Sequence, residues 1–352
     1  GYTVRKLANS ADMICRTDLP IREVIRRIDA STPLLFQIIL DPDDRVVGTV
    51  TDGDIRRGFA RGLQLEDPVE SCMRTSPILG EIGNDPHNAR ILHGRRFLPV
   101  CDENGCFDHI LVEQIGPRRA HRALVMAGGF GTRLGDRTKD TPKPLLPVGG
   151  KPILDHILER LEDYGIEKVD ISVHYLSDQI RRFVEERDNR CAISILEEQE
   201  PLGTAGCLGL VDQTSVDPIL MLNADVLTDV DLNALVEHHL RLGCDGTIAA
   251  SRYEYKVPYG VLRFDDADTL QGIEEKPTFY HLVAAGIYYL APSIVRMVPR
   301  ESRIDMPELL ERAVAHDLKL TVFPVHEYWS DVGHPADLED ADAFHRERGE
   351  GK

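Results

Sequence analysis

The chain has 352 residues and a net charge of −18, with 42% hydrophobic and 28% charged residues. This length allows two or three domains with proper cores, and no apolar run approaches the roughly 20 residues that a membrane span requires. Most of the negative charge lies after residue 118, and such a surface repels nucleic acid. Seven cysteines without a C-x-x-C pair and an N-terminus without an apolar signal segment lead us to expect a cytoplasmic protein.

Residues 1–118 contain a diverged internal repeat. "FQIILDPDDRVVGTVTDGDI" (36–55) aligns with "FLPVCDENGCFDHILVEQI" (97–115). Each copy has the pattern of a strand, an acidic turn and a second strand that runs into a helix. Because neither copy can bury its sheet alone, we expect the two to pack as a pseudo-twofold pair.

The segment "GTVTDGDIRRGF" (48–59) resembles the second-strand signature of a CBS domain, so residues 1–118 resemble an α+β CBS pair. In that family a Thr and an Asp three residues later commonly hold a nucleotide ribose, and these positions are Thr51 and Asp54. The resemblance implies an adenine or guanine nucleotide there, in a module that regulates the protein or assembles a homo-oligomer. The second copy has Val112 and Ile115 instead. The alternative is that Thr51 or Asp52 only caps a helix.

After the junction "IGPRRAH" (115–121), apolar runs alternate with amphipathic helices. The strand-like runs are 122–127, 168–173, 192–196, 218–222 and 246–251, and one helix is expected over 152–164 with Gly165 as its stop. This alternation predicts a Rossmann-like α/β domain over 119–352 with a mostly parallel sheet. Ligands of such sheets lie beyond the carboxyl ends of the strands.

The loop "MAGGFGTRLGDRTKDTPKPLLPVGGKP" (126–152) follows the first of these strands. Glycines let a backbone approach a ligand closely, so the loop is expected to face phosphate. It lacks the Gly-Lys-Ser/Thr triplet of a P-loop. It also fails the dinucleotide fingerprint, because Leu134 stands where a third small residue is needed after Gly129 and Gly131. A nicotinamide-dependent oxidoreductase is therefore disfavoured.

Two carboxylates are candidate metal ligands. Asp225 ends the fourth strand in "LNADV", and Asp331 follows an extended stretch with the only Trp. Together with phosphate oxygens they would make a Mg²⁺ site, because Mg²⁺ takes few protein ligands. The alternatives are a turn residue for Asp225 and a helix N-cap for Asp331.

Three basic residues are candidate phosphate ligands: Arg133 and Lys143 in the glycine-rich segment, and Lys276 in "GIEEKPTFY". A proline follows each lysine and holds it extended. Either lysine could equally be a solvated surface residue.

The motifs "MAGGFGTRLGDRTKDTPKPLLPVGGKP", "EPLGTAG", "LNADVL", "PYGV", "EEKP" and "WSDVG" follow the order found in sugar-phosphate nucleotidyltransferases, which the chain resembles over about residues 122–345. The resemblance implies in-line attack of a sugar 1-phosphate on the α-phosphorus of an NTP. The products would be an NDP-sugar for glycan biosynthesis and pyrophosphate. The implied site comprises catalytic Arg133 and Lys143; metal ligands Asp225 and Asp331; nucleotide-binding Ala127, Gly128, Gly129, Gly131, Gly203 and Thr204; and sugar-phosphate-binding Gly260, Glu275 and Lys276.

Two positions depart from the family pattern. Ala224 replaces the glycine usual before the metal-binding Asp, and Ala284 stands where many relatives have an Asn near the sugar. Ala224 adds a methyl group near the site, and Ala284 leaves the identity of the sugar open. A catalytically inactive nucleotide-sensing relative is the main alternative to an active enzyme.

The base is predicted from "ILEEQEPLGTAG" (195–206), where Glu198 stands five residues before Gly203. Relatives that use thymidine or uridine nucleotides tend to have Gln at this position. A carboxylate accepts parallel hydrogen bonds, which match the N1–H and N2 amine of guanine. We therefore expect GTP as donor and a hexose or heptose 1-phosphate as acceptor. The alternatives are UTP, dTTP or CTP, with Glu198 as a solvated residue of an acidic run.

Overall fold

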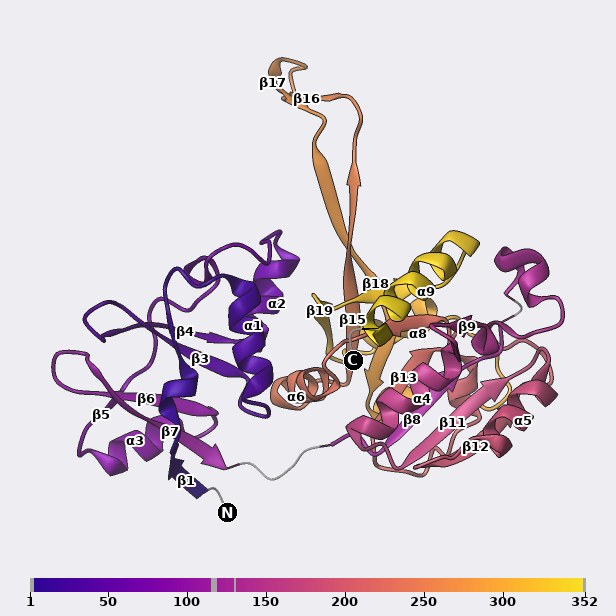
Figure 1. The fold of residues 1–352 in the computed structure, drawn as a ribbon, viewed down its shortest axis with the longest axis horizontal. Coiled ribbons are helices and arrows are strands. Elements are labelled where there is room, and N and C mark those ends of the chain that lie inside the picture. Colours follow the sequence, from indigo (N-terminus) through magenta and orange to yellow (C-terminus); the bar gives the residue numbers. More distant parts are fainter. Residues whose placement is uncertain (1–2, 115–118, 130, 351–352) are drawn as a thin grey trace. The chain divides into compact units, whose positions relative to one another are not determined.

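The computed structural model describes residues 3–114, 119–129 and 131–350, and the chain divides into two compact units, Gly1–Arg118 and Arg119–Lys352. Figure 1 shows both units. No helix among the described residues is long and apolar enough to cross a membrane.

The first unit holds a three-stranded sheet, β2-β3-β4, and a four-stranded sheet, β1-β7-β6-β5. Its elements are β1 (Thr3–Lys6), η1 (Ser10–Met13), β2 (Ile14–Arg16), α1 (Ile21–Ala30), β3 (Phe36–Leu40), β4 (Val46–Thr51), α2 (Asp52–Ala60), η2 (Val69–Ser71), β5 (Gly80–Glu81), α3 (Asp85–Leu92), β6 (Phe97–Cys101) and β7 (Phe107–Gln114).

The internal repeat is visible in equivalent contacts. Asp41 and Asp102 each accept, at 2.9 Å, the backbone N–H groups of the residues two and four positions further on. The rings of Phe36 and Phe97, which also occupy equivalent positions, stack with centroids 3.9 Å apart. The two copies thus pack against each other as predicted. The helix expected after the second copy would begin within 115–118, which lie outside the described residues.

The second unit is built on a seven-stranded sheet in the order β12-β11-β8-β13-β18-β15-β19. Its elements are β8 (Arg122–Met126), η3 (Thr132–Thr138), η4 (Lys143–Leu145), β9 (Pro147–Val148), β10 (Lys151–Pro152), α4 (Ile153–Tyr164), β11 (Lys168–Val173), α5 (Ser177–Glu186), β12 (Ala192–Glu197), η5 (Gly206–Gly209), β13 (Ile219–Asn223), β14 (Val226–Thr228), α6 (Leu232–Leu242), β15 (Gly246–Lys256), β16 (Gly260–Phe264), β17 (Leu270–Glu275), β18 (Thr278–Leu290), α7 (Pro292–Val295), α8 (Met306–Ala315), β19 (Leu320–Val325), β20 (Trp329–Asp331) and α9 (Pro335–Glu350).

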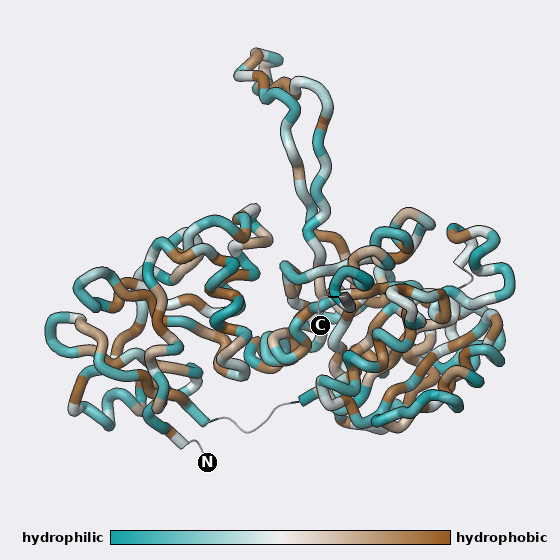
Figure 2. Tube along the Cα trace, in the orientation of Figure 1, coloured by the Kyte–Doolittle hydropathy of each residue, from teal (hydrophilic) through white to brown (hydrophobic). Residues whose placement is uncertain are grey.

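Only β18 runs antiparallel to its neighbours in this sheet, so the predicted mostly parallel α/β fold is confirmed. Figure 2 shows hydrophobic residues along the central strands. The side chains of Leu124, Met221 and Leu290 pack there against Ile294 and Leu309 from α7 and α8. β8 lies between β11 and β13, so the strand order reverses at β8, and the carboxyl end of β8 is the expected place for a ligand.

Beyond the sheet, β15 and β18 continue as a two-stranded ladder that carries β16 and β17 at its far end (Figure 1). We call residues 252–282 the arm. The ladder with β19 ends at Ser251, so the arm begins where the third strand is lost.

Candidate active site

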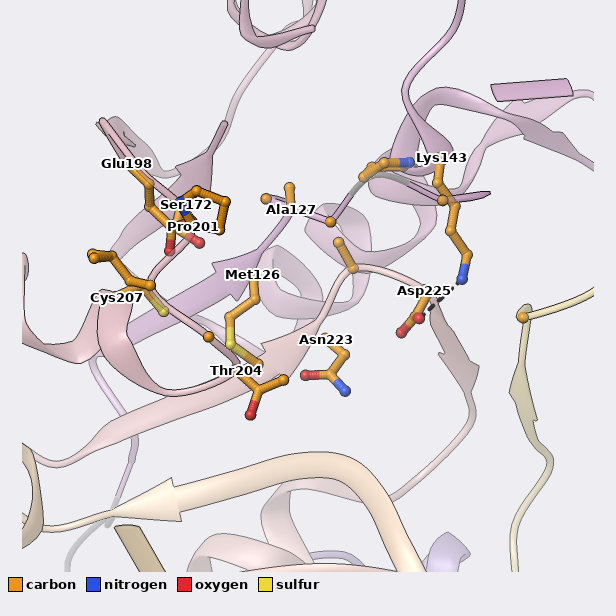
Figure 3. A pocket seen from close by; sticks show the side chains of 18 of the residues that line it. Met126, Ala127, Lys143, Ser172, Glu198, Pro201, Thr204, Cys207, Asn223 and Asp225 are labelled. Atoms are coloured by element: carbon orange, nitrogen blue, oxygen red, sulfur yellow. Dashed lines mark hydrogen bonds and ion pairs between the residues drawn. The ribbon is translucent and has the colours of Figure 1, made fainter. Parts of the chain in front are cut away.

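A cavity of about 410 Å³ lies at the carboxyl ends of β8 and β13 (Figure 3). Eleven of the predicted site residues line it: Ala127, Gly128, Gly129, Gly131, Arg133, Lys143, Glu198, Gly203, Thr204, Asp225 and Asp331. Figure 3 shows Glu198 at one end of the cavity and the paired Lys143 and Asp225 at the other, with Ala127 between them.

The glycine-rich loop turns back on itself directly after β8. Gly131 has a φ of +64°, and a Cβ there would lie 2.9 Å from the methyl group of Thr138 and 3.2 Å from the Cβ of Lys143. The Thr138 hydroxyl donates to the Gly131 carbonyl at 2.8 Å. Position 131 thus favours glycine, because the backbone has a positive φ and there is no room for a Cβ. The turn brings Lys143 to the cavity.

Asp225 and Asp331 are brought together by a short antiparallel ladder. Val226 at the start of β14 pairs with Asp331 at the end of β20, and the Val332 N–H donates to the Asp225 carbonyl at 2.9 Å. Asp331 ends β20, four residues before α9 begins at Pro335, so the N-cap alternative for Asp331 is wrong.

The charges of this cluster fit a divalent cation. The Lys143 ammonium donates to Asp225 Oδ2 at 3.0 Å. Asp225 Oδ1 is buried and has no hydrogen-bond partner among the described residues, which is costly for a carboxylate oxygen. Burial raises the pKa of Asp331, and the charge of Asp225 raises it further, while Lys143 and Arg133 lower it. A cation between the two carboxylates would give Asp225 Oδ1 a partner and would offset the repulsion that raises the pKa of Asp331.

Glu198 lies at the opposite end of the cavity and is only 7% exposed. Its backbone is fixed by two hydrogen bonds, from its own N–H to the Val173 carbonyl at 2.9 Å and from His174 Nδ1 to its carbonyl at 2.8 Å. Burial raises the pKa of Glu198, although the charge of His174 opposes the shift. The solvated alternative for Glu198 is therefore wrong. A Cβ on Gly128 would lie 2.9 Å from Glu198 Oε2, so this carboxylate requires a glycine opposite it.

Gly203 and Thr204 attach the neighbouring loop to α8. Gly203 has a φ of +79°, and a Cβ there would lie 2.6 Å from Asp305 Oδ1 and 2.7 Å from the Ile304 carbonyl oxygen. The Thr204 N–H donates to Asp305 Oδ1 at 3.0 Å, and its hydroxyl accepts from the Met306 N–H at 2.7 Å. The backbone N–H and the hydroxyl of Thr204 are thus both hydrogen-bonded to residues at the start of α8.

The three predicted sugar-phosphate residues lie outside the cavity lining. Gly260 and Glu275 pair across the β16–β17 ladder and Lys276 follows, all exposed on the arm. Ala284 is also exposed and outside the lining, whereas Ala224 lines the cavity and is 3% exposed.

The lining residues that were not predicted as site residues include Ser172, Cys207 and Asn223. Ser172 and Asn223 lie at the carboxyl ends of β11 and β13, so the rule that identified Asp225 could have found them. Cys207 lies in η5, and its sequence context carries no comparable signal.

Thr51 and Asp54 in the first unit form a reciprocal capping box at the start of α2. The Asp54 N–H donates to Thr51 Oγ1 at 3.1 Å, and the Thr51 N–H donates to Asp54 Oδ2 at 2.9 Å. Asp54 Oδ1 also accepts from Arg57 at 2.5 Å. Thr51 therefore caps α2, as the helix-cap alternative predicted.

Comparisons with known proteins agree with the fold. The profile of the nucleotidyl transferase family matches residues 122–348, and the CBS domain profile matches residues 4–61. The chain is 35% identical over 228 residues to a mannose-1-phosphate guanylyltransferase catalytic subunit beta of Drosophila melanogaster, covering 62% of this chain and 60% of the relative. It is 33% identical over 225 residues to the protein of that name from Xenopus tropicalis, covering 62% of each.

The chain thus spans about 60% of the length of these curated relatives. Among solved structures, HddC from Yersinia pseudotuberculosis superposes with a TM-score of 0.50 at 26% identity, over 64% of this chain and 99% of HddC. The match to residues 122–348 covers most of the chain, so the chain belongs to the nucleotidyl transferase family and carries a CBS domain at its N-terminal side.

Proposed function

We propose that the chain transfers GMP from GTP to a hexose or heptose 1-phosphate, giving a GDP-sugar for glycan biosynthesis and pyrophosphate. The observation that supports this proposal most is the arrangement of charged side chains in the cavity. A lysine and two carboxylates lie at one end, and a buried glutamate lies at the other. The relatives named mannose-1-phosphate guanylyltransferases support it.

At the phosphate end, the loop glycines leave room for the triphosphate beside Lys143 and Arg133. A phosphate oxygen of the sugar 1-phosphate attacks the α-phosphorus, and pyrophosphate leaves with its charge neutralised by Arg133. No general base is needed, because the sugar phosphate is already ionised at neutral pH. Catalysis then consists of alignment and charge neutralisation, and one such contact can contribute roughly 3–4 kcal/mol.

Asp225 and Asp331 would hold Mg²⁺ at this end. When bound, the ion would offset phosphate charge and fix the triphosphate for in-line displacement. Within the described part of the chain, no group of three or more His, Cys, Asp or Glu side chains gathers as a metal site. We therefore expect phosphate oxygens and water to complete the coordination, and tight Mg²⁺ binding only in the presence of nucleotide.

At the base end, Glu198 would accept the N1–H and N2 amine of guanine. Hydrogen bonds to a charged group contribute roughly 1.5–3 kcal/mol. Uracil and thymine present one donor flanked by carbonyl oxygens, and those oxygens would face the carboxylate and be repelled. A buried acceptor left unpaired adds to the discrimination against the wrong base.

Glu198→Gln tests this assignment. We expect kcat/KM for GTP to fall at least tenfold relative to UTP and dTTP, because the amide offers one acceptor in place of two. The matched control is Glu197→Gln, which changes the exposed neighbouring glutamate, ion-paired with Arg181 on the surface. A GTP preference that survives Glu198→Gln, or a wild-type preference for UTP or dTTP, would show that Glu198 does not read the base.

For the first unit we propose a CBS pair that regulates or assembles a homo-oligomer in the cytoplasm, with an adenine or guanine nucleotide at Thr51 and Asp54. The match of residues 4–61 supports the first repeat. Since both side chains already cap α2, a ribose there would have to share their oxygens with the helix. For the whole chain, the second candidate function is a catalytically inactive nucleotide sensor. An active enzyme releases pyrophosphate from an NTP and a sugar 1-phosphate, whereas an inactive sensor does not.

A further inference from the structure

The arm carries most of the exposed large hydrophobic side chains of the described residues. Ten of their sixteen exposed large hydrophobic side chains lie between Tyr253 and Leu282, led by Tyr259 at 73% and Phe264 at 65% exposure. Figure 2 shows hydrophobic segments near the far end of the arm. Exposed apolar side chains gathered in this number on one element indicate an interaction site.

The arm also lacks the packing that a ladder needs. Its pairs run from Arg252–Leu282 to Lys256–Thr278 and continue in β16 and β17. Among the described residues no third strand joins these ladders. Since an isolated two-stranded hairpin is marginally stable in water, we expect another surface to cover the arm.

A charged residue in an unusual backbone conformation lies where the β15–β18 ladder meets the β16–β17 ladder. Lys276 has a φ of +47°, which is rare for a residue other than glycine. Its N–H donates to the Tyr259 carbonyl at 3.2 Å, and the Val257 N–H donates to the carbonyl of the buried Pro277 at 2.9 Å. Backbone conformations of this kind cluster at ligand-binding sites. These hydrogen bonds thus hold the backbone at Lys276, and the Lys276 side chain is exposed to solvent.

This lysine is remote from the cavity of its own chain. Gly286 of β18 lies at the cavity edge, since a Cβ there would be 2.8 Å from Asn223 Nδ2. From residue 286 to residue 276 the chain is almost entirely extended strand, and ten residues at about 3.3 Å each span roughly 33 Å. The arm therefore holds Lys276 and Glu275 well away from Asp225 and Asp331.

The cavity, in turn, is short of positive charge for two anionic substrates. Arg133 and Lys143 are the only Arg or Lys residues among its described lining, and Lys143 is paired with Asp225. An NTP and a sugar phosphate together carry more negative charge than these groups offset. A further cation is expected on the open side of the cavity.

We propose that two copies of the chain pair through the arm, and that each arm places Lys276 and Glu275 beside the cavity of the other copy, where Lys276 binds the sugar phosphate. The identity of that anion rests on the proposed function. A twofold pair covers the same strip on both copies. Ten side chains of about 150–250 Å² each, roughly half exposed, provide about 900 Å² per copy over the two faces of the arm, of the same order as the ~800 Å² per partner of a stable interface.

Heterodimers of two defective subunits test the proposal directly. Lys276→Ala and Asp225→Asn subunits with different tags are co-expressed as full chains and isolated by two affinity steps. In this heterodimer one cavity combines an intact Asp225 with an intact Lys276 from the other subunit. We expect about half of the wild-type pyrophosphate release, while each homodimer stays nearly inactive. No recovery would overturn the exchange of arms.

The matched control pairs a wild-type subunit with the double variant Lys276→Ala/Asp225→Asn. With exchanged arms neither cavity is complete, so this heterodimer should be nearly inactive. If Lys276 served its own cavity, the same heterodimer would keep about half of the activity. The two heterodimers therefore give opposite results under the two arrangements.

The pairing itself is tested by sedimentation of the full chain. We expect Tyr259→Ser/Phe264→Ser to shift the mass towards the monomer, and Val216→Ser, an 81% exposed position outside the arm, to leave it unchanged. A monomeric wild type, or an arm variant that stays dimeric, would overturn the proposal. If the wild type releases no pyrophosphate, the proposed function fails, and sedimentation still decides the interface.

Discussion

Two carboxylates and a lysine meet because two short segments far apart in the chain form one ladder. Asp225 and Asp331 lie at the β14–β20 pairing, and Lys143 reaches Asp225 from the glycine-rich loop. We expect Asp225→Asn and Asp331→Asn each to lower kcat by more than 100-fold, about 2.7 kcal/mol, because each removes charge that would hold Mg²⁺. Steady-state pyrophosphate release at saturating Mg²⁺ measures this.

Asp229→Asn is the matched control for these variants. It removes a carboxylate from the other end of β14, which pairs with Arg348 outside the cavity lining. We expect wild-type kcat for it. A residual kcat above about a tenth of wild type in either cavity variant, a loss below ~1.4 kcal/mol, would show that the substituted residue does not hold the metal.

The raised pKa of the buried Glu198 has a measurable consequence for stability. The folded state retains the proton at a pH where the unfolded chain has lost it, so the free energy of unfolding falls as pH rises above the ordinary pKa of Glu. Glu198→Gln removes this loss. We expect the Tm of the variant minus that of wild type, without nucleotide, to increase between pH 4 and pH 7.

A difference in Tm that stays constant across this range, or that falls, would mean that the pKa of Glu198 is not raised in the folded protein. Glu197→Gln again serves as the control. Since Glu197 is exposed, its substitution shows how the same Glu to Gln change affects the Tm outside the cavity over this pH range.

At the level of elements, the loop before η5 depends on a single glycine. Gly203 and Gly150 both have a φ of +79°, but a Cβ on Gly203 would clash with Asp305 and Ile304 while one on Gly150 would meet nothing within 4 Å. We expect Gly150→Ala to cost about 1–2 kcal/mol of unfolding free energy from backbone strain alone. Gly203→Ala should cost clearly more and raise KM for the nucleotide.

Denaturant unfolding of both glycine variants measures this difference. Equal losses, with KM unchanged in Gly203→Ala, would show that the loop adjusts freely and that its contact with α8 does not shape the base end of the cavity.

The regular elements of the second unit were predictable where the burial pattern was simple. The run 122–127 became β8, and the expected helix 152–164 became α4, ended by Gly165 with a φ of +104°. The arm was not predictable, because β15 continues five residues past the apolar run 246–251 into a segment of alternating aromatic and charged residues. Such alternation is compatible with a strand, but it does not show that the strand leaves the sheet and keeps only one partner.

The site residues were predictable where they directly follow an apolar strand. Asp225 and Glu198 follow apolar strands and lie in the cavity as expected. Gly260 and Glu275 were assigned by resemblance alone, Lys276 also by its charge and the proline that follows it, and the arm holds all three outside the cavity lining. Local sequence specifies that these three residues lie together, whereas their position relative to the cavity depends on the course of a long ladder.

At the scale of the whole molecule, the two copies of the internal repeat differ at the position that caps a helix in the first copy. Thr51 caps α2, whereas the second copy has Val112 at the equivalent position. We expect Thr51→Ala to lower the free energy of unfolding of the first unit by about 1 kcal/mol, and Thr51→Ser, which keeps the hydroxyl, to preserve it. Denaturant unfolding checks this.

If a nucleotide also uses Thr51, titration calorimetry with ATP and GTP should show weaker binding to Thr51→Ala than to Thr51→Ser. Equal stability of the two variants would contradict the cap. Equal nucleotide affinity would remove Thr51 from any regulatory site.

The central claim is the reaction itself, and pyrophosphate release tests it most directly. Wild-type protein with Mg²⁺ is assayed with GTP, UTP, dTTP, CTP and ATP, each against a panel of hexose and heptose 1-phosphates. We predict release only when a sugar 1-phosphate is present, with the highest kcat/KM for GTP. No release with any pair, or a preference for UTP or dTTP, would contradict the assignment of a guanylyltransferase.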